Sequence, residues 1–188
     1  MRKWLALGLV VLGCGFVLLT LIPSGPSLPR AAADFVLPDM QGQVVRLSQL
    51  KGKVVFLNVW TTWCPPCRKE MPTMQALYRQ LQDQDFMMLA VSQDVDGRKT
   101  VVSYLEEGGY TFPVLLDVRG EVGRKYGVTG YPETFLIDRQ GMIVHHHIGY
   151  NNWASPESLA AVRGLIERGV WTPPAGGDVP GEQMPLRP

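Results

Sequence analysis

The chain has almost no excess charge, few cysteines and no internal repeat. Its 188 residues carry 18 Lys and Arg against 17 Asp and Glu, a formal net charge of +1, with no basic stripe. A nucleic-acid partner is therefore not expected. Only Cys64 and Cys67 lie outside the apolar N-terminus, and a bridge between them closes too small a loop to hold a fold together. A zinc site is not expected either, because no second Cys or His pair stands at ligand spacing.

The N-terminus combines two basic residues with a long uncharged stretch. Arg2 and Lys3 belong to a short cytoplasmic segment (residues 1–3), and residues 4–22 follow without a charge. A helix needs ~20 apolar residues to cross a bilayer, and flanking positive charges favour a cytoplasmic N-terminus. We predict a single-pass anchor in a bacterial cell membrane, with the catalytic part on the periplasmic side. Cys14, inside the apolar stretch, is interpreted as a small membrane-embedded hydrophobe.

Two segments flank the predicted domain, which occupies residues 34–171. Residues 23–33 contain Pro, Ser and Gly and predict a linker, whereas residues 172–188 are rich in Pro and Gly without periodicity and predict a disordered tail. The length allows one such domain with its own core. Ala31 and Ala33 form an A-x-A pattern, so cleavage of the apolar segment after Ala33 remains the alternative to a retained anchor.

Cys64 and Cys67 stand at the junction of an apolar run and an amphipathic segment. Residues 54–60 are short and rich in β-branched side chains, which predicts a buried strand. A helix is predicted after them by apolar residues at three- and four-residue steps, namely Met71, Met74, Leu77, Tyr78 and Leu81. Free N–H groups and the helix dipole at that helix start stabilise a thiolate, so Cys64 is the expected nucleophile. Pro65 and Pro66 suit the first turn.

Two motifs resemble the thioredoxin superfamily. They are WTTWCPPCRKE at residues 60–70 and GVTGYPETFLID at residues 127–138. More narrowly, the chain is similar to the membrane-anchored thiol-disulfide branch that contains TlpA, ResA and the cytochrome c maturation protein CcmG. The resemblance implies an α/β fold with a central mixed β-sheet flanked by helices. It also implies an N-terminal β-hairpin extension, which residues 35–50 match by their turn and flanking apolar residues.

The resemblance also implies the site. Cys64 and Cys67 are the catalytic residues and form the redox-active disulfide, and the proline of the second motif is cis and packs beside them. A residue just before a cis-proline in a cleft offers its backbone to an extended substrate strand. The expected substrate cleft consists of Trp63, Pro65, Pro66, Tyr131 and Pro132.

Position 58 departs from many thioredoxins, which carry a buried acid there to exchange protons with the second cysteine. Asn58 cannot titrate near neutral pH, so another group should accept the proton of Cys67. The candidates are Glu133, beside the cleft proline, and Asp94 and Asp96 in the loop after a central strand. The alternatives are plain surface charge or, for Glu133, pairing with a nearby base that fixes its loop.

Three consecutive histidines at residues 145–147 invite a metal site. Neighbouring side chains on a strand point to opposite faces, so the three cannot converge on one ion. We therefore expect solvent-exposed strand histidines, no metal and no cofactor.

The expected function is that of an extracytoplasmic, monomeric protein disulfide reductase. By resemblance, it acts on disulfides such as the haem-site cysteines of apocytochrome c, and an integral membrane thiol reductase is its electron donor. A general disulfide oxidant or isomerase is the same chemistry run in another direction and stays open. A redox-inactive binding protein or copper chaperone is disfavoured by C-x-x-C rather than C-x-x-x-C spacing. A peroxidase is disfavoured because Leu57 replaces the proline expected four residues before Thr61.

Overall fold

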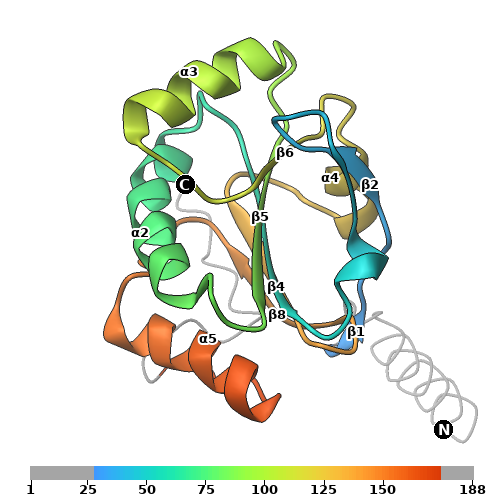
Figure 1. Ribbon diagram of the computed structural model, residues 1–188, viewed down its shortest axis with the longest axis vertical. Helices are drawn as coiled ribbons and strands as arrows, with labels where there is room; N and C mark the ends of the chain where they lie inside the picture. The colour runs from blue at the N-terminus through green and yellow to red at the C-terminus, as the bar shows by residue number, and fades with distance from the viewer. Residues whose placement is uncertain (1–27, 175–188) are drawn as a thin grey trace, which may run out of the picture.

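The structure, a computed structural model, describes residues 28–174 (Figure 1). The predicted anchor at residues 4–22, the linker up to residue 27 and the tail from residue 175 lie outside the described residues. Within residues 28–174, no helix is long and apolar enough to span a membrane.

The described residues form a mixed sheet of six strands in the order β1-β8-β7-β4-β5-β6 (Figure 1). These strands are β1 (Arg30–Ala31), β4 (Val54–Trp60), β5 (Phe86–Ser92), β6 (Val114–Leu116), β7 (Glu133–Ile137) and β8 (Met142–Ile148). The neighbours β4, β5 and β6 run parallel, whereas β7 is antiparallel to β4, and β8 to β7. The thioredoxin-like mixed sheet expected from the motifs is confirmed.

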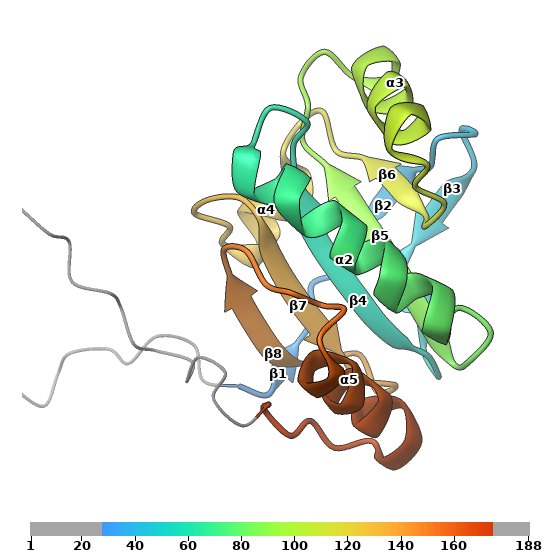
Figure 2. The same ribbon diagram turned by 90° about the vertical axis from the view of Figure 1, so that its left-hand side faces the viewer.

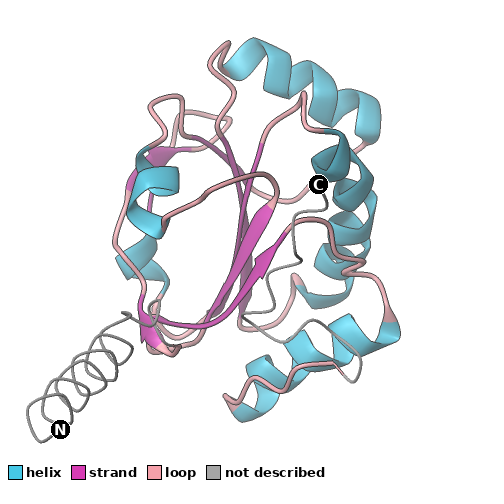
Figure 3. Cartoon of the chain, turned by 180° about the vertical axis from the view of Figure 1, so that it is seen from behind, coloured by secondary structure: helices cyan, strands magenta, loops and turns pink. Residues whose placement is uncertain are grey.

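Helices cover both faces of this sheet. One face carries α2 (Pro65–Leu81), α3 (Arg98–Gly108) and α5 (Pro156–Arg168), and Figure 2 shows α2 lying across β4 and β5. The other face carries α4 (Glu121–Tyr126), the hairpin of β2 (Val36–Pro38) and β3 (Val44–Arg46), and the short helix η1 (Leu47–Leu50) (Figure 3). The central strand β4 is buried throughout, with alternate side chains entering each layer. The predicted N-terminal hairpin is therefore present.

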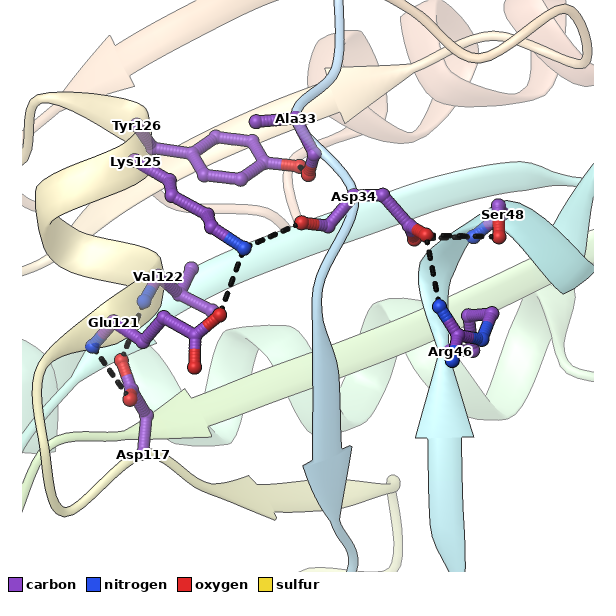
Figure 4. A network of polar contacts seen from close by, with 9 residues as sticks. All are labelled: Ala33, Asp34, Arg46, Ser48, Asp117, Glu121, Val122, Lys125 and Tyr126. Atoms are coloured by element: carbon purple, nitrogen blue, oxygen red, sulfur yellow. Dashed lines mark hydrogen bonds and ion pairs between the residues drawn. The ribbon is translucent and has the colours of Figure 1, made fainter.

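The domain begins earlier than the sequence indicated. Strand β1 pairs with β8, and the backbone N–H of Ala32 donates to the carbonyl oxygen of Gly141 at 2.9 Å. The hydroxyl of Tyr126 donates to the carbonyl of Ala33 at 2.9 Å, and Asp34 accepts hydrogen bonds from Ser48 (Figure 4). The linker prediction is therefore wrong over residues 30–33, because a two-residue strand leaves no periodic signal in the sequence. Cleavage after Ala33 would remove β1 from the sheet.

Candidate active site

Cys64 and Cys67 form a disulfide at the junction between β4 and α2. Their Cα atoms are 5.3 Å apart, and Cys64 is the N-cap residue of α2. The backbone N–H of Cys67 points at the Sγ atom of Cys64, at 3.2 Å, so a helix-start donor serves the sulfur that was expected to attack. Pro65 and Pro66 take the first helical positions and are exposed. Both cysteines are buried in the disulfide form, with exposed fractions of 4% for Cys64 and 1% for Cys67.

Asp94 supports the loop that leads into Cys64. Its buried carboxylate accepts hydrogen bonds from the backbone N–H of Thr62 at 3.0 and 3.1 Å and from the Thr62 hydroxyl at 2.6 Å. The hydroxyl of Ser92 donates to it at 2.8 Å. Asp94 therefore holds the chain two residues before the nucleophile. Asp96, the neighbouring candidate, is exposed.

The structure brings together two residues of the expected substrate cleft, Trp63 and Tyr131, from separate loops. The peptide bond from Tyr131 to Pro132 is cis, and Pro132 is buried. The ring of Tyr131 meets that of Trp63 edge to face, with centroids 5.8 Å apart. Trp63 is 67% exposed, which leaves a large apolar surface next to Cys64 for a partner.

Glu133 is fully engaged by its surroundings. Its Oε1 atom accepts hydrogen bonds from the backbone N–H groups of Thr129 and Gly130 at 2.7 and 3.2 Å, and Oε2 lies 2.7 Å from Nε2 of His146. Burial alone would raise the pKa of Glu133, but hydrogen bonds from His146 and these backbone groups outweigh it and hold the pKa below its ordinary value. This geometry matches the alternative in which Glu133 pairs with a base and fixes the loop before the cleft proline.

A different carboxyl group, that of Glu70, is buried on the same helix as Cys67. It is 1% exposed on α2, one turn after Cys67. Its Oε1 atom accepts from Nε1 of Trp153 at 2.8 Å and from the backbone N–H of Asn151 at 3.1 Å, and Oε2 accepts from Nδ2 of Asn58 at 3.0 Å. Burial raises the pKa of Glu70 to about 7, and these hydrogen bonds offset only part of the rise.

Glu70 lies in the first motif, at residues 60–70, but is not among the proton-transfer candidates that the sequence indicated. The spacing in the sequence indicates the burial of Glu70. One face of the helix, set by three- and four-residue steps, carries Cys67, Glu70, Met71 and Met74, and all four are buried. An acid on that face must be buried near the second cysteine. The buried acid missing at position 58 is thus supplied from α2, with the Asn58 amide bound to it.

The three histidines do not behave alike, and the prediction that they are solvent-exposed is wrong for His145. That ring is 7% exposed and stacks on Trp171 with centroids 4.5 Å apart, because the chain after α5 returns across β8. Burial lowers the pKa of His145 to about 4. His146 pairs with Glu133. Within residues 28–174, no three His, Cys, Asp or Glu side chains are grouped as they would be around a metal ion.

A cavity of about 250 Å³ lies at the opposite end of the sheet from the cysteines. It is lined by residues of β1, η1 and the turn between β7 and β8, together with the start of β4. None of the expected site residues lines it, so the chemistry is located at the cysteines and not at this cavity.

A disulfide at a strand-to-helix junction, next to a cis-proline and over a mixed sheet, defines a thioredoxin-like thiol-disulfide oxidoreductase. Residues 29–146 match the model of the AhpC/TSA family, and the chain belongs to that family. Its relatives fit the class that the site defines.

Several relatives are named as thiol-disulfide oxidoreductases. The chain is 41% identical over 138 residues to the thiol-disulfide oxidoreductase ResA of Geobacillus thermodenitrificans, covering 73% of this chain and 76% of that one. It is 36% identical over 154 residues to ResA of Halalkalibacterium halodurans, covering 79% and 87%. A crystal structure described as a thiol:disulfide interchange protein DsbE from Chlorobium tepidum superposes with a TM-score of 0.64 at 35% identity, covering 73% of this chain and 94% of that one. The protein is a thiol-disulfide oxidoreductase of the ResA and DsbE type, as the motifs indicated.

Proposed function

We propose that this oxidoreductase is a membrane-tethered, extracytoplasmic reductant of protein disulfides. The observation that carries the direction of transfer is the buried carboxyl group of Glu70 beside Cys67. A carboxylate near a thiol disfavours the thiolate, which weakens the dithiol form relative to the disulfide. Strong oxidants of this fold do the opposite, since their reduced form is stabilised.

The first chemical step belongs to Cys64. Its thiolate attacks one sulfur of a partner disulfide, a Cys64–partner bond forms, and the partner's S–S bond breaks. The departing partner thiolate takes a proton from solvent. The N–H of Cys67 at 3.2 Å and the helix start favour the thiolate form of Cys64 before the attack.

The second step belongs to Cys67 and Glu70. Cys67 passes its proton to the carboxylate of Glu70 and attacks Sγ of Cys64. The Cys64–partner bond breaks, and the second partner sulfur leaves as a thiolate that takes a proton from solvent. Two electrons have then passed to the partner, and the Cys64–Cys67 disulfide remains. A pKa of about 7 keeps a large fraction of Glu70 ionised at neutral pH and therefore able to accept the proton.

The tether is proposed from the sequence of the N-terminus. Arg2 and Lys3 precede an uncharged stretch of bilayer length, and β1 starts at Arg30. The seven residues between the stretch and β1 reach at most ~25 Å, so the domain stays close to the membrane surface. Cell fractionation should leave the full-length chain in membranes. A soluble product that begins at Asp34 would support cleavage instead.

The proposed partners follow from the family resemblance. Haem-site cysteines of apocytochrome c form a disulfide between two residues of one extended segment, which suits a cleft that offers backbone beside Pro132. An integral membrane thiol reductase would return two electrons to the Cys64–Cys67 disulfide after each cycle.

Trapping in whole cells tests this proposal. A Cys67→Ser variant cannot resolve the mixed disulfide, so Cys64 should stay bonded to its substrate, and mass spectrometry of the adduct should identify a c-type apocytochrome. A Cys64→Ser variant is the matched control and should trap no substrate. Equal trapping by both variants, or adducts without a cysteine pair, would contradict the proposal.

A further inference from the structure

Two aromatic rings form one side of the cleft. Trp63 precedes the nucleophilic cysteine, Tyr131 precedes the cis-proline, and their rings meet edge to face at 82° with centroids 5.8 Å apart. We call this pair the aromatic wall. Both residues sit on loops, so their orientation depends on what holds them.

Gln93 holds the tyrosine of the aromatic wall. The hydroxyl of Tyr131 donates to Oε1 of Gln93 at 2.8 Å, and Nε2 of Gln93 donates to Oδ2 of Asp117 at 2.6 Å. A carboxylate only accepts, so Asp117 fixes which end of the amide faces it and leaves the oxygen for the hydroxyl. Burial and then the charges of Asp117 and Asp94 raise the pKa of Tyr131, which keeps its hydroxyl a donor.

Asp117 is itself anchored to the start of α4. It is 1% exposed, and its carboxylate accepts the backbone N–H groups of Glu121 at 2.7 Å and Val122 at 2.8 Å (Figure 4). On α4, Gly123 leaves room for the amide, because a Cβ atom there would lie 2.7 Å from Nε2 of Gln93. The backbone N–H of Gln93 also donates to the carbonyl of Trp60 at the end of β4, at 2.9 Å. The side chain of Gln93 therefore connects the Tyr131 hydroxyl to the start of α4, through Asp117, and its backbone is bonded to the end of β4.

We infer that Gln93 is a positioning residue for polypeptide substrates, which orients the Tyr131 side of the aromatic wall through its bond to Asp117. The inference rests on the thiol-disulfide activity of the cysteines. An extended peptide on either side of a target disulfide would contact the wall, whereas a small disulfide that reaches only Cys64 would not. Gln93 therefore acts on peptide affinity and leaves the chemistry of the cysteines unchanged.

The size of the effect follows from ordering one side chain. If the Tyr131 ring is mobile in the free protein, its immobilisation on peptide binding costs conformational entropy. Peptide affinity is then about two- to tenfold lower than when the ring is already held in place. Replacing Gln93 with methionine keeps the length and removes both hydrogen bonds. Tyr131→Phe keeps the ring and removes only the hydroxyl, so it leaves the fold intact even if the methionine variant is destabilised.

The experiment compares two substrates on the full-length protein, with dithiothreitol as electron source. One is a synthetic peptide with a single internal Cys-x-x-Cys disulfide, and the other is hydroxyethyl disulfide. Gln93→Met should raise KM for the peptide about two- to tenfold, with kcat and the rate on hydroxyethyl disulfide unchanged. Tyr131→Phe should raise KM for the peptide by a similar factor, because it removes the same hydrogen bond. The double variant should have a peptide KM no higher than that of the weaker-binding single variant, because both substitutions remove the same hydrogen bond between Tyr131 and Gln93.

A matched control separates this from general destabilisation. Gln75→Met removes another hydrogen-bonded amide, one that bonds to Thr111 away from the cleft, and should leave the rates on both substrates unaffected. Additive single effects, an unchanged peptide KM in Tyr131→Phe, or an equal rise in Gln75→Met would overturn the role of Gln93. Loss of the thiol-disulfide activity itself would appear differently, as a wild-type protein that reduces neither substrate.

Discussion

Replacing Glu70 with glutamine removes the buried carboxyl group beside Cys67 and should change how stability depends on pH. Burial raises the pKa of Glu70 from 4.5 to about 7. At 1.36 kcal/mol per pH unit, the folded state disfavours the ionised form by ~3 kcal/mol. The folded protein thus holds this proton more tightly than the unfolded chain, so the stabilisation is complete below pH 4.5 and is lost as pH rises through about 7.

The site can accept glutamine without losing its hydrogen bonds. The new Oε1 can still accept from Trp153 and Asn151, and the new Nε2 would face Nδ2 of Asn58. Oδ1 of Asn58 has no hydrogen-bond partner among the described residues, so a flip of that amide would bring this oxygen toward the new donor. Thr134, whose hydroxyl now accepts from Asn58, can reverse its role and donate.

Urea denaturation of the oxidised protein between pH 5 and pH 8 measures the effect without titrating the cysteines. The difference in free energy of unfolding between wild type and Glu70→Gln should change by roughly 2–3 kcal/mol across that range. The wild type should become less stable relative to the variant as pH rises. Glu121→Gln is the control, because Glu121 is exposed and its pKa lies below its ordinary value, so its titration falls outside the range. Parallel curves for wild type and Glu70→Gln would refute the raised pKa, and with it the proton-acceptor role.

Three further predictions concern other groups of the site. In the reduced protein, alkylation followed by mass mapping should label Cys64 faster than Cys67 below neutral pH, and the reverse order would overturn the assignment of the nucleophile. Glu133→Gln should lower the free energy of unfolding by about 1–2 kcal/mol and leave the rate of mixed-disulfide resolution unchanged. A slower resolution would instead support a proton-transfer role for Glu133. His145→Gln should weaken acid destabilisation between pH 6.5 and pH 4, because the lowered pKa of His145 means that its stabilisation is lost as pH falls through that range; equal acid sensitivity of the two proteins would contradict this.

Features with local signals could be predicted from the sequence. The start of α2 depends on Cys64 and the two prolines after it. Ser155 is the N-cap residue of α5, and its hydroxyl accepts from the N–H of Ser158 at 3.1 Å. The hairpin of β7 and β8 follows from a turn between two apolar runs. In each case, the residues that decide the structure are within a few positions of one another.

Features set by distant partners could not be predicted in the same way. Trp153, which bonds to Glu70, is 83 positions away along the chain, and the burial of His145 depends on Trp171 from another segment. Glu133 was a proton-transfer candidate because it follows the cleft proline, with pairing to a base as the alternative. Its partner His146 lies on a neighbouring strand, whose register no local pattern fixes. Burial and pairing decide the pKa of a carboxyl group, so its chemistry emerges only with the fold.

The reduction potential of the Cys64–Cys67 pair tests the central claim most directly. Titration of the protein against glutathione redox buffers, with the oxidised fraction measured at equilibrium, gives this value. A reductant with a buried carboxyl group beside Cys67 should have a potential below about −200 mV, nearer to that of thioredoxin. A potential near about −120 mV, as in the strong oxidant DsbA, would contradict the account and make the protein a donor of disulfides.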